Sequence, residues 1–149
     1  MVDQNQSFDR QDLIRLEEAF RQIRREALSE WNRDGVAGLG ASQARILVIL
    51  SETGPQKASS LAEQMCITSG AVTGMADSLI DLGLIRRERS ETDRRIVMLS
   101  ITENGEKLIG DITEKRLSVM ERIATGLTVA EAKELIRLLV KMVHRRKES

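Results

Sequence analysis

Apolar residues recur every three or four positions near the start of the chain, which is the spacing of one helical face. The recurring positions are Leu13, Leu16, Phe20, Ile23, Ala27 and Trp31. Charged residues flank this narrow stripe, so the pattern predicts a long helix over residues 8–31 that packs against a partner helix. A glycine-rich break at residues 34–40 follows it.

Shorter apolar patterns occupy the centre of the chain. Ser42 is expected to cap a helix that Gly54-Pro55 ends. The run Ser60-Leu-Ala-Glu63 has the pattern of a capping box and predicts a helix of less than two turns. Thr68 is then expected to cap a longer helix that ends at Gly83.

Two runs rich in β-branched residues come next, at residues 85–88 and 96–101, and they predict a hairpin with a long charged tip. Thr102 is expected to cap another helix, and a capping box at residues 128–131 opens the last one. The order predicts a mostly α fold of the α+β class, with long terminal helices around a compact centre.

Residues 61–79 have the arrangement of a helix-turn-helix. Ala62 is small where the second helix crosses it, and Val72 and Met75 are expected to face inward. Four residues are then left outward near the N-terminus of the second helix: Thr68, Ser69, Gly70 and Thr73. A recognition helix reads base edges in the major groove with that end, so these four are candidate DNA contacts.

The hairpin carries five arginines and three carboxylates between residues 84 and 102. An arginine-tipped hairpin beside a recognition helix is a winged helix, whose tip can enter the minor groove. Arg89, Arg94 and Arg95 are the candidate contacts of this wing with the minor groove and the phosphates. Arg86 and Arg87 are interpreted as solvated strand residues.

This order of elements resembles the multiple-antibiotic-resistance-regulator (MarR) family of bacterial transcription factors, most strongly over residues 42–108. The family pattern is Asp-x-Arg, five residues, then Leu-Thr, and here it is matched by Asp93, Arg95 and Ile101-Thr102. The resemblance implies a winged helix-turn-helix regulator, usually a repressor, that binds a pseudo-palindromic operator in double-stranded DNA as a homodimer. It also implies that Asp93 braces Arg95 at the wing tip and that Asp77 lies close enough to couple to it.

By the same resemblance, residues 1–33 and 108–149 form the dimerisation helices and residues 40–105 form the DNA-binding domain. A small anionic aromatic effector is expected to shift the recognition helices. The chain departs from the family at Cys66, which stands in the turn where glycine is common and puts the usual positive-φ turn in question. Gly74 and Ser78 replace longer side chains, so base readout by this helix alone is expected to be modest.

Two residues have more than one interpretation. Cys66 is interpreted as a packing residue, with a thiol-based redox switch as the alternative; no basic residue lies near it in the sequence. Trp31 is consistent with a place in an effector pocket and equally with a place in the dimer core.

Several classes of protein are excluded by what the sequence lacks. One cysteine cannot form an intrachain disulfide, and with the single His144 it cannot assemble a zinc site, so no cofactor or metal is expected. The sequence has no phosphate-binding loop and no catalytic constellation, so the protein is not expected to be an enzyme. Without a signal-peptide pattern or a membrane-spanning apolar run, it is expected to be cytoplasmic, with no membrane partner.

The formal net charge of the 149 residues is zero, with 23 basic against 23 acidic residues. This balance argues against a bulk-basic nucleic-acid binder and keeps open a rival, a winged-helix module that binds protein and not DNA. The arginines of the hairpin indicate instead that the zero is a sum over a polarised surface. A surface of this kind argues against strong non-specific affinity for DNA, but it does not exclude DNA binding.

Overall fold

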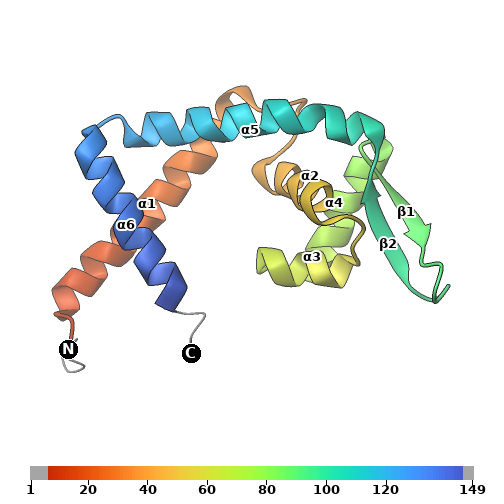
Figure 1. The fold of residues 1–149 in the computed structure, drawn as a ribbon, viewed down its shortest axis with the longest axis horizontal. Helices are drawn as coiled ribbons and strands as arrows, with labels where there is room; N and C mark the ends of the chain where they lie inside the picture. Colours follow the sequence, from red (N-terminus) through yellow and green to blue (C-terminus); the bar gives the residue numbers. More distant parts are fainter. Residues whose placement is uncertain (1–6, 146–149) are drawn as a thin grey trace. The chain divides into compact units, whose positions relative to one another are not determined.

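The computed structural model describes residues 7–145 of the chain. Along these residues run α1 (Arg10–Asp34), α2 (Ala41–Thr53), α3 (Ala58–Met65), α4 (Ser69–Asp81), β1 (Ile85–Arg89), β2 (Val97–Ile101), α5 (Glu103–Ala124) and α6 (Val129–Arg145) (Figure 1). This architecture confirms the predicted class, a mostly helical chain with one hairpin.

The chain divides into two compact units. The central unit is Glu30–Arg116, and the terminal unit combines Met1–Ser29 with Leu117–Ser149. Both α1 and α5 run from one unit into the other. The outer limits of the expected dimerisation segments, residues 1 and 149, lie outside the described residues.

The central unit has a closed apolar core beside the hairpin, formed largely by α2, α3 and α4. Its largest fully buried side chains are Ile46, Leu47, Leu50, Leu61, Val72, Leu79, Ile85 and Ile112. Burying one side chain of this size contributes about 1.5–3 kcal/mol relative to leaving it in water. This core fixes the angle between α3 and α4.

Two predicted helix starts are wrong. The first turn of α2 begins at Ala41 with Gly40 as its N-cap, and the Gly40 N–H donates to Gln43 Oε1 at 3.0 Å, so Ser42 lies inside the helix. The eight-residue α3 begins at Ala58, which places Ser60 within it and makes it longer than predicted.

The early start of α3 has a long-range cause. Gln56 exchanges two backbone hydrogen bonds with Leu99 of β2, at 3.0 and 2.7 Å. These bonds hold the chain extended up to Lys57, and the Lys57 carbonyl then accepts the first helical hydrogen bond, from the Leu61 N–H at 3.1 Å. A pairing with a strand 43 positions later leaves no local sequence signal.

The other predicted caps are confirmed. The Thr68 hydroxyl accepts from the Ala71 N–H at 3.1 Å, and the Thr102 hydroxyl accepts from the Gly105 N–H at 3.2 Å. Thr128 and Glu131 satisfy each other's backbone N–H groups at 2.8 and 3.2 Å, which is the reciprocal pattern of a capping box.

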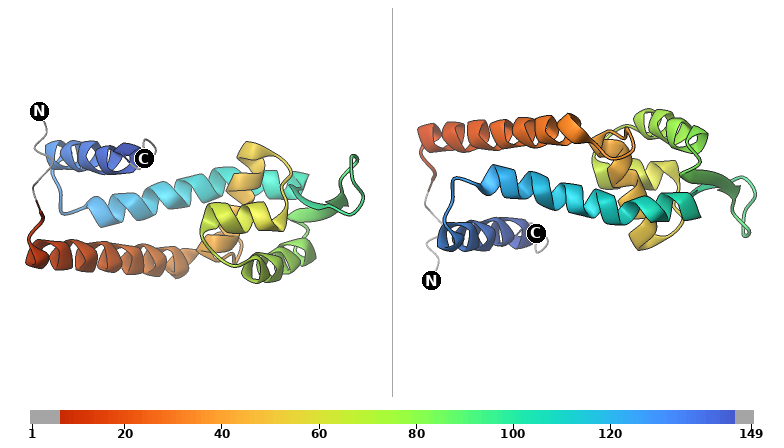
Figure 2. Two further views of the ribbon diagram at one scale, coloured as in Figure 1. Left: turned by 90° about the horizontal axis from the view of Figure 1, so that it is seen from below. Right: turned by 90° about the horizontal axis from the view of Figure 1, so that it is seen from above.

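The hairpin pairs β1 and β2 antiparallel, with Ile85 opposite Ile101 and Arg89 opposite Val97. In both views of Figure 2 it extends beyond α4, away from the helices of the central unit. Its base is fixed by close packing at Gly105, where an added Cβ would lie 2.3 Å from the Leu84 carbonyl oxygen. The hairpin is therefore anchored at its base and exposed at its tip.

The terminal unit has a different character. Among its described residues α6 buries no side chain, and α1 within this unit is largely exposed. Figure 2 shows the end of α5 between α1 and α6. The exposed apolar residues of α6 are Val129, Leu135, Ile136, Leu138, Leu139, Val140, Met142 and Val143.

Candidate nucleic-acid interface

The second helix of the helix-turn-helix, α4, presents a polar face to solvent. Val72, Ala76 and Leu79 are buried against the core. Thr68, Ser69, Gly70 and Thr73 are all exposed, around the N-terminal turns of the same helix. The structure thus brings the four predicted major-groove residues together on one accessible surface.

Two hydroxyl groups on this face have defined partners. Thr73 Oγ1 donates to the Ser69 carbonyl at 2.9 Å, and Thr68 Oγ1 accepts the capping bond from Ala71. The Thr73 oxygen keeps its lone pairs for a donor, and the Thr68 hydroxyl keeps its hydrogen for an acceptor. This surface can therefore exchange hydrogen bonds with base edges or phosphates without first breaking its own.

The wing tip contains a carboxylate and an arginine held together by several hydrogen bonds. Arg95 donates to Asp93 through its backbone N–H at 3.0 Å and through Nε and Nη2 at 3.1 Å each. The guanidinium bonds, then the backbone bond, hold the pKa of Asp93 below its ordinary value, and the charge of Lys57 adds to this. The Arg95 side chain is nevertheless 90% exposed, so the pair fixes its direction without covering it.

Two further wing arginines differ from Arg95 in their contacts. Arg89 Nη1 donates to the Arg94 carbonyl at 2.8 Å, which closes the loop between the strands. The Arg94 side chain is exposed. Within the described residues, Arg89 therefore supports the loop, whereas Arg94 extends from it.

The ion pair of Asp77 is with a wing arginine other than Arg95, and its coupling to Arg95 stays a prediction. Asp77 Oδ1 accepts a hydrogen bond from Arg87 Nη2, so it pairs with the base of the wing on β1 and not with Arg95 at the tip. The physical reason is reach, because β1 packs directly against α4. Sequence reasoning treated Arg87 as a solvated strand residue; the spacing of ten residues from Asp77 gives no periodic signal that would have indicated the pair.

Gln43 is a second residue that sequence reasoning missed. Its Nε2 donates to Ser78 Oγ at 3.2 Å, while its Oε1 accepts the capping bond from Gly40. One amide thereby ties the start of α2 to the last turns of α4. Its place three residues after a cap is the signal that could have identified its local bond, but nothing in the sequence points to Ser78.

Cys66 occupies the turn of the helix-turn-helix in a left-handed conformation, with φ 55° and ψ 42°. The positive-φ turn is therefore kept without a glycine, at the steric cost that a side chain has there. The thiol is exposed and lies 3.8 Å from the Glu63 carbonyl, so the interpretation of Cys66 as a packing residue is wrong.

Trp31 lies in the core of the central unit and is only 4% exposed. Its indole Nε1 donates to the Leu39 carbonyl at 2.9 Å, across the glycine-rich turn. The side chain thus holds this turn against the end of α1. Within a single chain the core of the central unit already buries this side chain, so the structure favours neither the effector pocket nor the dimer core over the other.

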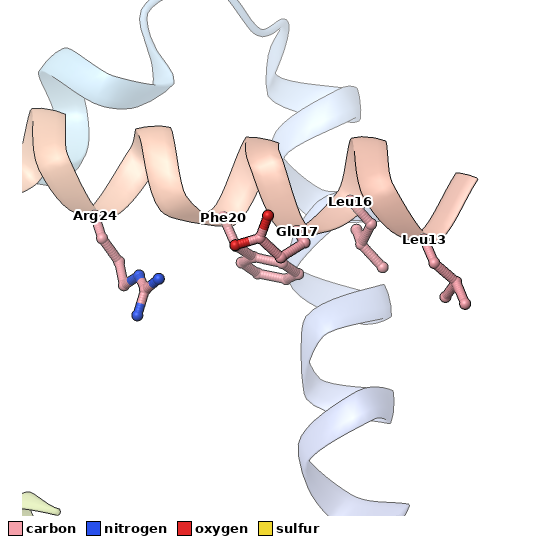
Figure 3. A pocket seen from close by; sticks show the side chains of 5 residues that line it. All are labelled: Leu13, Leu16, Glu17, Phe20 and Arg24. Carbon is pink, nitrogen blue, oxygen red and sulfur yellow. The ribbon is translucent and has the colours of Figure 1, made fainter. Parts of the chain in front are cut away.

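A shallow recess lies on α1, on the apolar stripe predicted from the sequence. It measures about 470 Å³ and is lined by Leu13, Leu16, Glu17, Phe20 and Arg24. Figure 3 shows these side chains along α1. The recess is apolar and open, which suits a second protein surface more than an enclosed ligand.

Two other kinds of site are absent from the part of the chain that the structure describes. No helix in this part of the chain is long and apolar enough to cross a bilayer. No group of three or more His, Cys, Asp or Glu residues is placed to hold a metal ion within residues 7–145.

Comparisons with known proteins agree with this geometry. Residues 39–97 match the model of the MarR family. The chain is 33% identical over 139 residues to the HTH-type transcriptional regulator YpoP of Bacillus subtilis, covering 93% of this chain and 94% of that protein. It belongs to the MarR family.

A second relative and a solved structure extend this result. The HTH-type transcriptional repressor MdtR of Bacillus subtilis is 31% identical over 129 residues, covering 87% of this chain and 81% of MdtR. A mutant MarR from E. coli complexed with operator DNA shares the fold, with a TM-score of 0.74 and 20% identity over 91% of this chain and 99% of that one.

Family membership confirms the resemblance seen in the sequence. The chain is a MarR-family transcriptional regulator and not an enzyme. Membership also disfavours the rival interpretation as a module that binds only protein. The segment that matches the family model includes every predicted DNA-contact residue, from Thr68 to Arg95.

Proposed function

We propose that this MarR-family regulator is a homodimeric repressor that binds a pseudo-palindromic operator, with α4 in the major groove and the wing in the minor groove. The observation that carries the proposal is the exposed hydroxyl and glycine face of α4 beside an arginine-tipped hairpin in one compact unit. The E. coli MarR structure with the same fold contains operator DNA.

The exposed apolar faces of the terminal unit support the dimer. Leu135, Leu138, Leu139 and Met142 are spaced as one stripe along α6, and the α1 recess forms another apolar surface. Large exposed apolar patches mark protein interfaces. A two-fold dimer presents two recognition helices to half-sites roughly 34–36 Å apart, one turn of DNA.

Titration of a fluorescent operator duplex, followed by anisotropy, tests the wing. Arg95→Ala should weaken binding by roughly tenfold or more, because a charge-assisted contact in the minor groove is lost. Arg86→Ala is the matched control, since Arg86 is also a wing arginine paired with a carboxylate, Glu88. Arg86→Ala should leave affinity close to that of the unmodified protein.

Two outcomes would contradict the proposal at different levels. Unchanged affinity in Arg95→Ala would remove Arg95 from the interface while leaving α4 in place. A protein that retains no sequence preference on any duplex, even at low salt, would refute operator binding as a whole.

A small anionic aromatic effector that releases the operator is the further part of this proposal, and it follows from family membership alone. An effector that binds the DNA-free state more tightly must shift the population away from the bound one. A screen for compounds that raise the melting temperature and release the duplex tests this; if no compound did both, effector control would be refuted.

A further inference from the structure

Arg87 of β1 pairs with Asp77 on the exposed face of the recognition helix, close to the candidate DNA contacts. We propose that Arg87 reads a guanine in each half-site, and that Asp77 is the positioning residue that holds its guanidinium at the face of α4. The inference rests on the proposed function and names a specificity determinant within it.

The recognition helix lacks a long donor of its own. Between Ser69 and Asp81 the sequence contains no lysine or arginine. Arginine makes the bidentate contact with guanine O6 and N7 through the rigid fork of its guanidinium, which lysine and short hydroxyls lack. A long, bidentate donor for guanine must therefore come from another element.

Two glycines leave room for such a donor. A Cβ placed on Gly70 or Gly74 would meet no atom within 4 Å, so neither glycine is required by packing in the described structure. Glycine is nevertheless among the poorest helix formers. Their bare backbone allows α4 to approach the groove closely, and Gly74 lies one turn before Asp77 on the exposed side of the helix.

The geometry places Arg87 beside Asp77, one turn after Gly74 on the exposed side of the helix. Side chains alternate along a strand, so Arg87 shares a face of the hairpin with the buried Ile85, the face that packs toward the core. Its Nη2 donates to Asp77 Oδ1. The Arg87 and Asp77 side chains are 45% and 57% exposed, so the pair is open to a ligand on its outer side.

A carboxylate on one amino group leaves the other donors of the guanidinium free. Arginine has five N–H donors in a rigid fork, and a guanine uses two of them. Orienting the fork in advance reduces the entropy lost on binding. This arrangement also explains an acidic residue on a helix that approaches a polyanion, because Asp77 acts through the arginine that it orients.

A purely structural role accounts less well for the pair. Exposed ion pairs stabilise a fold very little. The contact between α4 and β1 is already secured by Leu79, Leu84 and Ile85, which are buried. An exposed ion pair at the edge of this core adds little to the stability of the contact.

Selection from a pool of randomised duplexes tests the proposal, with base preferences determined for each variant. The unmodified protein should prefer guanine at one position of each half-site. Arg87→Lys keeps the charge and loses the fork, so it should reduce that preference by roughly tenfold or more while other positions keep theirs. Asp77→Asn should reduce the same preference by a smaller factor, at an unchanged melting temperature.

The controls separate orientation from general damage. Arg86→Lys changes the adjacent arginine, which pairs with Glu88 on the opposite face, and should alter no preference. In an Arg87→Ala background, adding Asp77→Asn should cause no further loss at the guanine position, because the arginine that Asp77 orients is already gone.

Three results would overturn the inference. Arg87→Lys could keep every preference, or Arg87→Ala could weaken all sequences equally with a shallower salt dependence, which is the signature of a phosphate contact. In both cases operator binding by the unmodified protein would still stand. If the unmodified protein enriched no sequence, the proposed function would fail together with the inference.

Discussion

The two units of this chain use the same apolar residue types to opposite effect. In the central unit, Leu61 and Leu79 are completely buried, whereas on α6 of the terminal unit Leu135 and Leu138 are more than two-fifths exposed. Helices in the central unit cross in several directions and close around one another. The terminal helices present apolar stripes that their own unit does not cover, so a periodic pattern identifies a helix without showing whether its partner lies in the same chain.

The largest effect is expected from opening the closed core. Leu79→Ala should lower the free energy of unfolding by about 2–5 kcal/mol, the range for truncating a buried leucine. The matched control is Leu82→Ala at the end of the same helix, where the side chain is 55% exposed, and it should change stability by less than about 0.5 kcal/mol. Urea denaturation of both variants measures the difference, and equal losses would contradict the contrast.

Placing a charge on the exposed apolar stripe of α6 should have a smaller effect on the free energy of unfolding and a larger one on dimerisation. Leu138→Glu should weaken the proposed dimer by about 2 kcal/mol or more, roughly thirtyfold in Kd, because a two-fold interface contains the substitution twice. Sedimentation velocity across a concentration series measures the shift. The central unit should keep its protection from hydrogen exchange, and a variant that stayed dimeric at all concentrations would exclude the α6 stripe from the interface.

Removing one cap should affect only the central unit. Thr68→Ala should cost about 1 kcal/mol, since the Ala71 N–H loses its acceptor, whereas Thr68→Ser keeps the hydroxyl and most of the stability. Thermal denaturation compares the two variants. Equal melting temperatures for the alanine and serine variants would show that the hydroxyl does not stabilise α4.

The smallest effect concerns the exposed pair at the wing tip. The pKa of Asp93 is lowered by Arg95, so the pair is fully formed above the ordinary carboxyl range and is lost only as the pH falls through that lowered pKa. Between pH 5 and 8, operator affinity should show no titration from this pair. NMR titration of the Asp93 carboxyl carbon should give a midpoint below 3.8, which rises toward that value in Arg95→Ala; a midpoint above 3.8 in the unmodified protein would refute the bracing.

Local signals in the sequence account for most of the fold. The hairpin, the Thr68 cap and the capping box at Thr128 depend on residues a few positions apart, and each was predictable. The errors at Ser42 and Ser60 have another origin: several residues near each start can cap a helix, and the choice is made by contacts such as Gln56 with Leu99.

In the candidate site, too, the features set by nearby residues were predictable and those set by long-range contacts were not. Exposure of Ser69, Gly70 and Thr73 follows from the helical period of α4, and the contact of Asp93 with Arg95 follows from a motif three residues long. The pairing of Asp77 with Arg87 depends on how the strand folds back on the helix. No periodic pattern in the sequence indicates that β1 packs back against α4.

The position of Trp31 makes it an optical reporter for one half of the molecule. It is the only tryptophan, the chain has no tyrosine, and its indole N–H is bonded to the Leu39 carbonyl inside the central unit. Its emission therefore depends on whether the glycine-rich turn stays closed over the end of α1. Fluorescence can therefore follow the unfolding of the central unit in an unlabelled protein.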